Sequence, residues 1–463
     1  MSPLDQDRAT PPTPGAIRPF DFPAVARRTL DATGLELRVA RMARLPMASA
    51  HLFMRAGEGA LAPEAAGLAV LAGDALEGGS VHRSGTELAE ALEGLGARLD
   101  VLTGWEGTSV SLSCLADRLD EGLALLAEAV REPAFPDDEV ERTRAQQLAQ
   151  IRQRAMDPSS LAADAVARRV FSPEVPYGRP QLGGDASVEA LGRDHLRGYA
   201  DACWRPGGGG LVLVGDLDAD EMVERAGAVL GDWSGTPELE QDFQVEPRTR
   251  DRRIWIVDRP GAVQSELRVG HVGASRADPH YFALRILNAI LGGTFTSRLN
   301  LRLREKHGYT YGVRSRFSFR SRQGPFTVST AVGTGVTAPA LGAIVEEVER
   351  LRVDGPTEEE VAAARDYIAG VFPLGLETVG QVASQVTRAL VHDLPPDYFD
   401  TYRDRIRGVT VSSVRAAAEA HLRPEEVQMV VVGDAASVRG PLEELGLGPV
   451  TLLDEDFEPH DDG

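Results

Sequence analysis

The chain has 463 residues, of which 49 are Lys or Arg and 70 are Asp or Glu, so its formal net charge is −21. This charge argues against a nucleic-acid partner, which would need clustered basic residues. No run approaches the roughly 20 apolar residues that span a bilayer, and the first residues lack the basic and apolar regions of a signal peptide. We therefore expect a cytoplasmic protein without a membrane partner. Two Cys are too few for a disulfide framework.

The first part of the chain opens with a lead-in and continues with strand and helix patterns. Residues 1–18 are rich in Pro, Thr and Asp and are predicted to be disordered. An alternating strand follows, and an apolar helix is predicted at 67–78. Residues 135–151 have an acidic first turn that leads into a helical pattern, and the apolar run GLVLVGD predicts a closing strand. These elements predict a first domain at 19–235.

The second part repeats this order after a polar, Pro-containing stretch, which predicts a linker at 236–250. A strand pattern is followed by an apolar helix at 280–292. Residues 355–371 repeat the acidic turn and helical pattern of the first part. These elements predict a second domain at 251–455, and residues 456–463 are predicted to form an acidic tail.

Two short sequence matches indicate that the two parts are copies of one unit. Arg205-Pro206 recurs as Arg423-Pro424, and the Val-Gly-Asp at 214–216 recurs at 432–434, so both matches are 218 residues apart. A shared spacing is the signature of an internal repeat. Because strands and helices are mixed without strict βαβ alternation, the predicted fold class is α+β. Each of the two homologous domains is expected to be an antiparallel sheet with helices packed on it.

The segment 291–316, LGGTFTSRLNLRLREKHGYTYGVRSR, carries the strongest motif. Two glycines end one helix, residues 297–306 predict the next, and a His-Gly pair breaks it before an alternating strand. This order lets Arg304 at the helix end and Tyr311 at the strand start point at one spot. An Arg fork and a phenolic hydroxyl suit a peptide carbonyl or a developing oxyanion. From the residues alone, a solvated basic helix with a Tyr in the sheet is the simpler interpretation, because the helix dipole also favours Arg there.

The string GGTFTSRL…LREKHGYTYGV resembles the second-half signature of the pitrilysin/insulinase family of inverted zincins, which includes the mitochondrial processing peptidase. The resemblance covers nearly the whole chain and implies one half of a clam-shell chamber. In that family an Arg and a Tyr bind substrate and stabilise the transition state at a zinc ion held by the other half of the enzyme. They match Arg304 and Tyr311. Tyr309 departs from the aliphatic residue usual in the family, and His307 is a weaker candidate for contact with substrate.

Active members of the family carry H-x-x-E-H on the first helix of the first half, where two His ligate zinc and the Glu acts as general base. Alignment on Gly-Leu-Ala at 67–69 places Val70, Gly73 and Asp74 at those positions. The third protein ligand, a Glu from a later helix, aligns with Gln150. Val70 cannot ligate a metal, Gly73 cannot act as a base, and one carboxylate at Asp74 does not make a zinc site. The zinc site is therefore predicted to be lost.

No other catalytic pattern replaces the lost motif. No two of the nine His are three or four residues apart, so no helix offers a pair of His ligands. The sequence also has no G-x-S-x-G elbow and no phosphate-binding glycine motif. We therefore expect this chain to bind no metal and no cofactor, and we expect zinc in a partner subunit.

The resemblance implies a non-catalytic, substrate-binding subunit of a heterodimeric zinc metallopeptidase. Arg304 and Tyr311 would then reach a peptide bound at the zinc of a homologous partner that carries H-x-x-E-H. The acidic charge would favour a basic or unstructured peptide, bound by adding a strand to a sheet edge. The alternative is a non-enzymatic scaffold or peptide-binding protein related to respiratory-complex core subunits. A self-sufficient hydrolase with an unrecognised site is a third interpretation.

Overall fold

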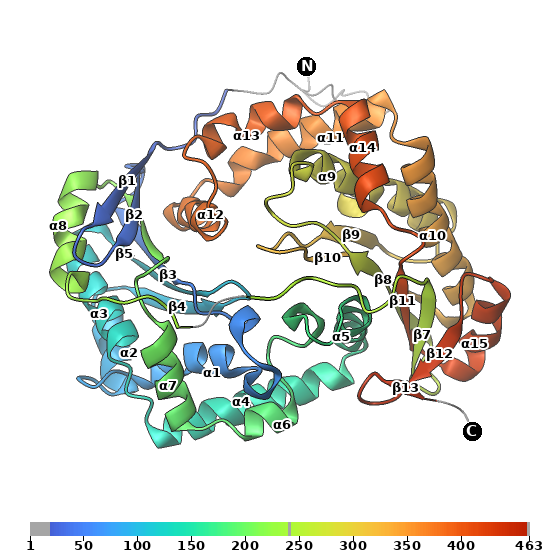
Figure 1. The fold of residues 1–463 in the computed structure, drawn as a ribbon. Helices are drawn as coiled ribbons and strands as arrows, with labels where there is room; N and C mark the ends of the chain where they lie inside the picture. The colour runs from blue at the N-terminus through green and yellow to red at the C-terminus, as the bar shows by residue number, and fades with distance from the viewer. Residues whose placement is uncertain (1–18, 239–241, 461–463) are drawn as a thin grey trace, which may run out of the picture.

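The computed structural model describes residues 19–238 and 242–460. The predicted lead-in at 1–18, three residues of the predicted linker and the last three of the predicted tail lie outside the described residues. The described chain forms two sheets surrounded by helices, with the first sheet on the left of Figure 1 and the second on the right. The α+β fold class is confirmed. No described helix combines the length and apolar character needed to cross a bilayer.

The first sheet has six strands in the order β1-β2-β6-β3-β5-β4. Every residue of β6 is buried, since this strand lies inside the sheet with helices on both of its faces. The strands are β1 (Val25–Leu30), β2 (Leu35–Arg41), β3 (Met47–Met54), β4 (Arg98–Thr103), β5 (Thr108–Leu115) and β6 (Gly210–Gly215).

The second sheet has seven strands in the order β13-β12-β7-β11-β8-β10-β9. Its strand β11 is buried throughout, as β6 is in the first sheet. The strands are β7 (Arg253–Asp258), β8 (Gln264–Val272), β9 (Val313–Phe317), β10 (Pro325–Gly333), β11 (Gln428–Gly433), β12 (Val450–Leu453) and β13 (Pro459–His460).

The strand orders correspond one to one over five strands, which agrees with the sequence repeat. The series β2-β6-β3-β5-β4 of the first sheet matches β7-β11-β8-β10-β9 of the second. In each sheet the closing strand inserts between two earlier strands, parallel to one and antiparallel to the other. Both sheets are therefore mixed, although most pairs are antiparallel as predicted. The parallel pairs escaped the prediction because the closing strand returns after a long run of helices and not through a hairpin.

The helices lie around the two sheets and follow the predicted positions closely. The apolar helix predicted at 67–78 is α1 with the short 3₁₀ turn that follows it, and the acidic turns at 135–151 and 355–371 begin α4 and α11. The helices of the first half are α1 (Leu68–Asp74), α2 (Gly85–Gly94), α3 (Leu119–Arg131), α4 (Asp137–Met156), α5 (Pro158–Val170), α6 (Asp185–Glu189), α7 (Arg193–Cys203) and α8 (Ala219–Leu230). Those of the second half are α9 (Tyr281–Asn288), α10 (Thr337–Asp354), α11 (Glu358–Val371), α12 (Val379–Val391), α13 (Tyr398–Arg407), α14 (Val411–His421) and α15 (Ala435–Glu444).

Each half gives one helix to the sheet of the other half. Helix α5 packs Val166 and neighbouring apolar residues against Trp255 and Val430 of the second sheet. Helix α12 packs Val382 and Val386 against the buried strands β2, β3 and β6 of the first sheet. Figure 1 shows both helices on the inner side of the sheets, α5 beside β8 and β11 and α12 beside β3. The halves are therefore joined by two apolar contacts of the kind that fills a domain core.

The contact of α12 with the first sheet is close and is fixed at its edge by polar groups. A Cβ added to Gly210 of β6 would lie 2.1 Å from Leu390 Cδ1 of α12, so glycine is the only residue that fits there without movement. Arg55 donates to Asp393 at 3.0 Å and to the carbonyl of Gly208 at 2.7 Å. These contacts hold residues from both halves in one rigid arrangement.

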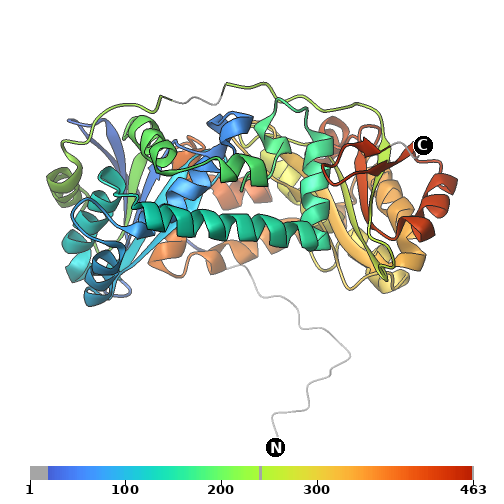
Figure 2. The same ribbon diagram turned by 90° about the horizontal axis from the view of Figure 1, so that it is seen from below.

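The connection between the halves and the C-terminal residues are both packed against the protein. Figure 2 shows the connection running across the molecule from one half to the other, and its Phe243 and Val245 pack on the apolar cluster that contains α5. Strand β13 pairs with β12, and Glu458 accepts hydrogen bonds from Arg248 at 2.8 Å and Arg169 at 3.2 Å. The predicted acidic tail is therefore part of the second sheet as far as His460.

Candidate functional site

Arg304 and Tyr311 line one hollow of about 580 Å³ in the second half. The side chain of Tyr311 is fully exposed, while Arg304 is mostly buried with 26% of its side chain exposed. The hollow is also lined by β9 residues from Val313 to Arg316 and by Tyr367 of α11. The structure thus brings the two motif residues to one place, as their spacing suggested.

Two π-helical segments flank this hollow, Ala289–Gly293 after α9 and Asn300–Lys306 before β9. The second one replaces most of the regular helix predicted at 297–306, and such segments occur often at functional sites. Buried Asn300 ties the turn together: its Nδ2 donates to the carbonyl of Val313 at 2.9 Å, and its Oδ1 accepts from the Val313 N–H at 3.2 Å. Gly308 ends the segment with a φ of +65°, a conformation that favours glycine.

The basic residues of this segment have separate roles. Arg298 forms a two-pronged ion pair with Glu360 of α11, at 2.6 and 2.8 Å, and Arg302 pairs with carboxylates of α10. Arg304 instead lies over the ring of Phe295, 3.6 Å from its centroid, with Glu305 at 3.0 Å. The first two arginines therefore fasten the segment to the helices behind it, and Arg304 is the one presented to the hollow.

Exposed aromatic and apolar side chains surround the hollow. Phe295 is 67% exposed, Leu301 50% and Tyr367 52%. All three line a neighbouring hollow of about 390 Å³, and of them Phe295 and Tyr367 also line the Arg304 hollow. His307 lies outside the residues lining either hollow in the described chain, and its ring stacks on Tyr309 at a centroid distance of 5.0 Å. Large exposed side chains gathered beside a cavity are typical of an interaction surface.

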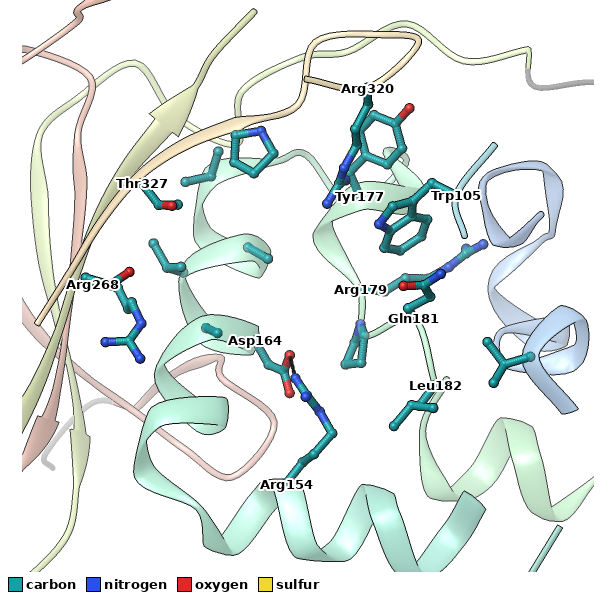
Figure 3. A pocket seen from close by; sticks show the side chains of 18 of the residues that line it. Trp105, Arg154, Asp164, Tyr177, Arg179, Gln181, Leu182, Arg268, Arg320 and Thr327 are labelled. Atoms are coloured by element: carbon teal, nitrogen blue, oxygen red, sulfur yellow. Dashed lines mark hydrogen bonds and ion pairs between the residues drawn. The ribbon is translucent and has the colours of Figure 1, made fainter. Parts of the chain in front are cut away.

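The degenerate zinc helix α1 lies beside a different cavity, of about 430 Å³, which is shared by the two halves (Figure 3). Val70 lines this cavity, and so do Trp105 and Tyr177 from the first half and Arg268 and Arg320 from the second. Figure 3 shows Arg154 and Asp164 meeting at one end of the cavity, where they form an ion pair. Val70, which aligns with the first His of the family's zinc motif, therefore presents an apolar side chain to a cavity that charged and polar residues partly line.

Gly73 is packed too tightly for any larger residue. A Cβ at this position would lie 2.6 Å from Thr103 Oγ1, and that hydroxyl is held by the carbonyl of Ala69 at 3.3 Å and by Thr108 Oγ1 at 3.1 Å. Asp74, at the end of α1, is exposed. The packing of α1 against Thr103 therefore leaves no room for a Glu side chain at position 73.

The N-terminus of α1 is capped by Glu58, which sequence reasoning missed. The carboxylate accepts from the backbone N–H groups of Ala69 at 2.9 Å, Val70 at 3.2 Å and Gly67 at 3.1 Å. Burial raises the pKa of Glu58 to about 7, although these three donors and Arg179 act in the opposite direction. The helix lacks a Ser, Thr, Asp or Asn at its own start. In the sequence, the only sign of a cap from a distant residue is this lack of a capping side chain at the start of α1.

Gln147 is the residue of α4 that contacts α1. Its side-chain amide nitrogen, Nε2, donates to the carbonyl of Gly67 at 3.1 Å and to that of Leu182 at 2.8 Å, and the side chain is buried. Gln150, the residue aligned with the third zinc ligand of the family, is exposed one turn further along α4. The alignment of Gln150 remains a prediction, and Gln147 is the position at which the structure joins the two helices.

Gly73→Ala is expected to lower the free energy of unfolding by about 1–3 kcal/mol, because the added methyl group overpacks the contact with Thr103. In a Thr103→Ala background the loss should be smaller, since the clashing hydroxyl is gone. Gly94→Ala in α2 is the matched control: nothing lies within 4 Å of its added Cβ, so stability should rise slightly or stay unchanged. Urea unfolding of G73A, T103A, the double variant and G94A measures this. Equal effects of G73A and G94A would contradict the tight packing at Gly73.

Comparison with known proteins places this α+β architecture and its altered first helix in a peptidase family. The family model described as insulinase (peptidase family M16) matches residues 40–179, and the one described as peptidase M16 inactive domain matches residues 190–368. The chain belongs to the M16 peptidase family and has lost the zinc motif of its active members.

Similar proteins include bacterial relatives with different descriptions. An uncharacterized zinc protease of Mycobacterium leprae is 28% identical over 77% of this chain and 80% of its own length. The non-peptidase homolog YmxG of Helicobacter pylori is 23% identical over 84% of this chain and 90% of its own. The crystal structure of a peptidase M16 inactive domain from Pseudomonas fluorescens is 26% identical and has a TM-score of 0.83, covering 89% of this chain and 98% of that one.

Proposed function

We propose that this chain is the substrate-binding, non-catalytic subunit of a two-subunit zinc peptidase. In this proposal a homologous partner holds zinc with an intact H-x-x-E-H motif, and this chain supplies Arg304 and Tyr311. The observation that carries the proposal is the hollow in which both residues meet, in a chain whose own zinc helix has Val70 and a tightly packed Gly73 at the motif positions.

The sheet edge beside the hollow suits an extended peptide. Strand β9 is the last strand of the second sheet, so its outer edge pairs with no other strand of the described residues. Its residues Val313–Arg316 line the hollow next to Tyr311. A peptide added along β9 would make main-chain hydrogen bonds there. Its carbonyl groups would then lie near the Arg304 guanidinium and the Tyr311 hydroxyl, two donors that suit a carbonyl becoming an oxyanion.

The charge near the hollow refines the proposed substrate. The chain as a whole is acidic, but Arg304, Arg314 and Arg316 all line this hollow. Three nearby guanidinium groups would repel a basic side chain at this point. We therefore propose an unstructured peptide whose reacting segment is neutral or acidic, with the acidic remainder of the surface acting only at longer range.

The exposed side chains beside the hollow provide a surface for the partner. Phe295, Leu301 and Tyr367 are exposed in the single chain and lie on the same side as Arg304. Burying such side chains is a usual source of affinity between subunits. A partner seated here would bring its own metal site towards the Arg304 and Tyr311 hollow, as the proposal requires.

The test is reconstitution with the M16 homologue of the same organism that carries H-x-x-E-H. We expect each chain alone to leave an unstructured peptide uncut and the mixture to cleave it, with one catalytic zinc ion held by the partner. Cleavage by this chain alone, or full activity of the zinc-bearing homologue without it, would contradict the proposal. The second candidate, a protein with no part in catalysis, is favoured by the description of the Helicobacter pylori relative as a non-peptidase homolog. It predicts that the two chains associate without any gain in cleavage.

A further inference from the structure

A cluster of two histidines and one aspartate lies in the second half, away from both the hollow and α1. Asp278 and His280 precede α9, and His421 is the last residue of α14. Their nearest ligand atoms all lie within 4.8 Å of one another. Helices α9 and α14 pack against each other, and the cluster lies where the start of α9 meets the end of α14.

The separations within the cluster fit a tetrahedral metal site. His280 Nδ1 lies 3.1 Å from His421 Nε2 and 3.6 Å from Asp278 Oδ1, and His421 Nε2 lies 3.4 Å from Asp278 Oδ1. Ligand atoms about 2.0–2.2 Å from a metal ion, at tetrahedral angles, are roughly 3.3–3.6 Å apart. The three observed distances lie around this value, so one ion could be reached by all three atoms with shifts of a few tenths of an ångström.

The protein also holds the three side chains in a suitable state for ligation. Asp278 Oδ1 accepts from the backbone N–H of His280 at 2.8 Å, which fixes the direction of the carboxylate. The buried Nδ1 of His421 has no hydrogen-bond partner in the described chain, and its Nε2 lies 3.1 Å from His280 Nδ1 and 3.4 Å from Asp278 Oδ1. Nε2 therefore faces the other two ligand atoms, and with the ring proton on Nδ1 it would offer its lone pair to an ion.

The exposure of the cluster leaves a route for the ion and room for a water ligand. The side chain of His280 is 38% exposed, whereas those of Asp278 and His421 are 18% and 12% exposed. Two ligands thus lie inside the protein and one lies at its surface. A fourth position on the solvent side can be taken by water, as in zinc sites with three protein ligands.

We propose that Asp278, His280 and His421 form a binding site for a divalent transition-metal ion, with Zn²⁺ as the ion that best fits two imidazoles and a carboxylate in tetrahedral arrangement. The ion would tie the start of α9 to the end of α14. Helix α9 leads directly into the π-helical segment Ala289–Gly293 beside the Arg304 hollow, so the site would stabilise the support of that hollow from behind. This role is structural and does not depend on the proposed function.

Zinc titration of the EDTA-treated full chain at near-neutral pH tests the site, by isothermal calorimetry and by equilibrium dialysis. We expect one ion per chain, and at least a tenfold loss of affinity in both His421→Ala and Asp278→Asn. His280→Ala, at the more exposed ligand, provides a third variant if His421→Ala folds poorly by circular dichroism. His82→Ala is the matched control, because His82 is exposed, pairs with Glu132 and lies outside the cluster.

Two further readouts separate a built site from casual binding at the surface. Zn²⁺ should raise the melting temperature of the unmodified chain and of H82A, and should leave that of D278N unchanged. Co²⁺ in place of Zn²⁺ should give the visible absorption of a tetrahedral ion. Absence of one-to-one binding in the unmodified chain, or unchanged affinity in both H421A and D278N, would overturn the site.

Discussion

In the reconstituted heterodimer, Tyr311→Phe is expected to lower kcat about 10²–10³-fold while KM stays nearly constant. The substitution removes only the phenolic hydroxyl, and that hydroxyl is proposed to bind the oxyanion more strongly than the ground-state carbonyl. Tyr311 is fully exposed in the free chain, so the fold and the assembly should survive its loss. Steady-state kinetics of the purified complex, with gel filtration to confirm assembly, measures the effect.

Tyr309→Phe is the matched control for this prediction. It removes the same hydroxyl two residues away, but Tyr309 stacks on His307 and packs on the core, outside the residues that line the hollow. It should leave kcat within about twofold of the unmodified complex, as is usual for a residue with no role in the transition state. If Y311F turns over as fast as Y309F, Tyr311 has no part in the reaction and the proposed role of this chain is wrong. A rise in KM alone would show that Tyr311 only holds the substrate.

The sequence allowed the repeated units of the fold to be predicted because their signals are local. The apolar helices predicted at 67–78 and 280–292 are seen as α1 with its following turn and as α9 with the π-helical segment that continues it. Amphipathic periodicity and acidic first turns depend on neighbours within a few residues, and such signals survive in a single sequence. The same holds for the turn between Arg304 and Tyr311, which a Gly with positive φ ends as expected.

The features that escaped prediction all depend on contacts between distant residues. His280 and His421 are 141 residues apart, and Gln147 reaches Gly67 across 80 residues. A search for His three or four residues apart cannot find ligands that meet only after folding. The exchange of α5 and α12 between the sheets is hidden for the same reason, since an apolar helix face does not specify which sheet it covers.

The exchange of α5 and α12 between the sheets joins the two halves of the chain, and it also shapes the cavity beside Val70. Because α5 lies on the second sheet and α12 on the first, neither half can turn away from the other without exposing a buried apolar face. The cavity beside Val70 is lined by residues of both halves for the same reason. In the proposed complex, a chamber that closes over a peptide would therefore form between two chains and not by movement within this chain.

Acid is expected to destabilise the contact between α12 and the first sheet, because two half-buried histidines lie there. Burial lowers the pKa of His51 to about 4, and burial with neighbouring Arg276 lowers that of His392 to about 4. His51 Nδ1 lies 3.3 Å from Thr387 Oγ1 of α12. In the unfolded chain a histidine titrates near about 6.5, so between this value and about 4 the unfolded state binds more protons than the folded one.

The stability from these histidines is therefore complete above about pH 6.5 and falls as the pH drops towards 4, by about 2 kcal/mol per histidine at pH 5. Urea unfolding of the chain near pH 7.5 and near pH 5 measures the loss. Burial also lowers the pKa of His271 to about 4, so His51→Gln should remove about a third or less of the histidine-dependent part of this slope, whereas His82→Gln at the exposed His82 should leave the slope unchanged. An identical slope in H51Q and the unmodified chain would show that His51 is charged in the folded state. In that case the imidazole would lie in water, and α12 would not cover β3 as closely as the buried contact requires.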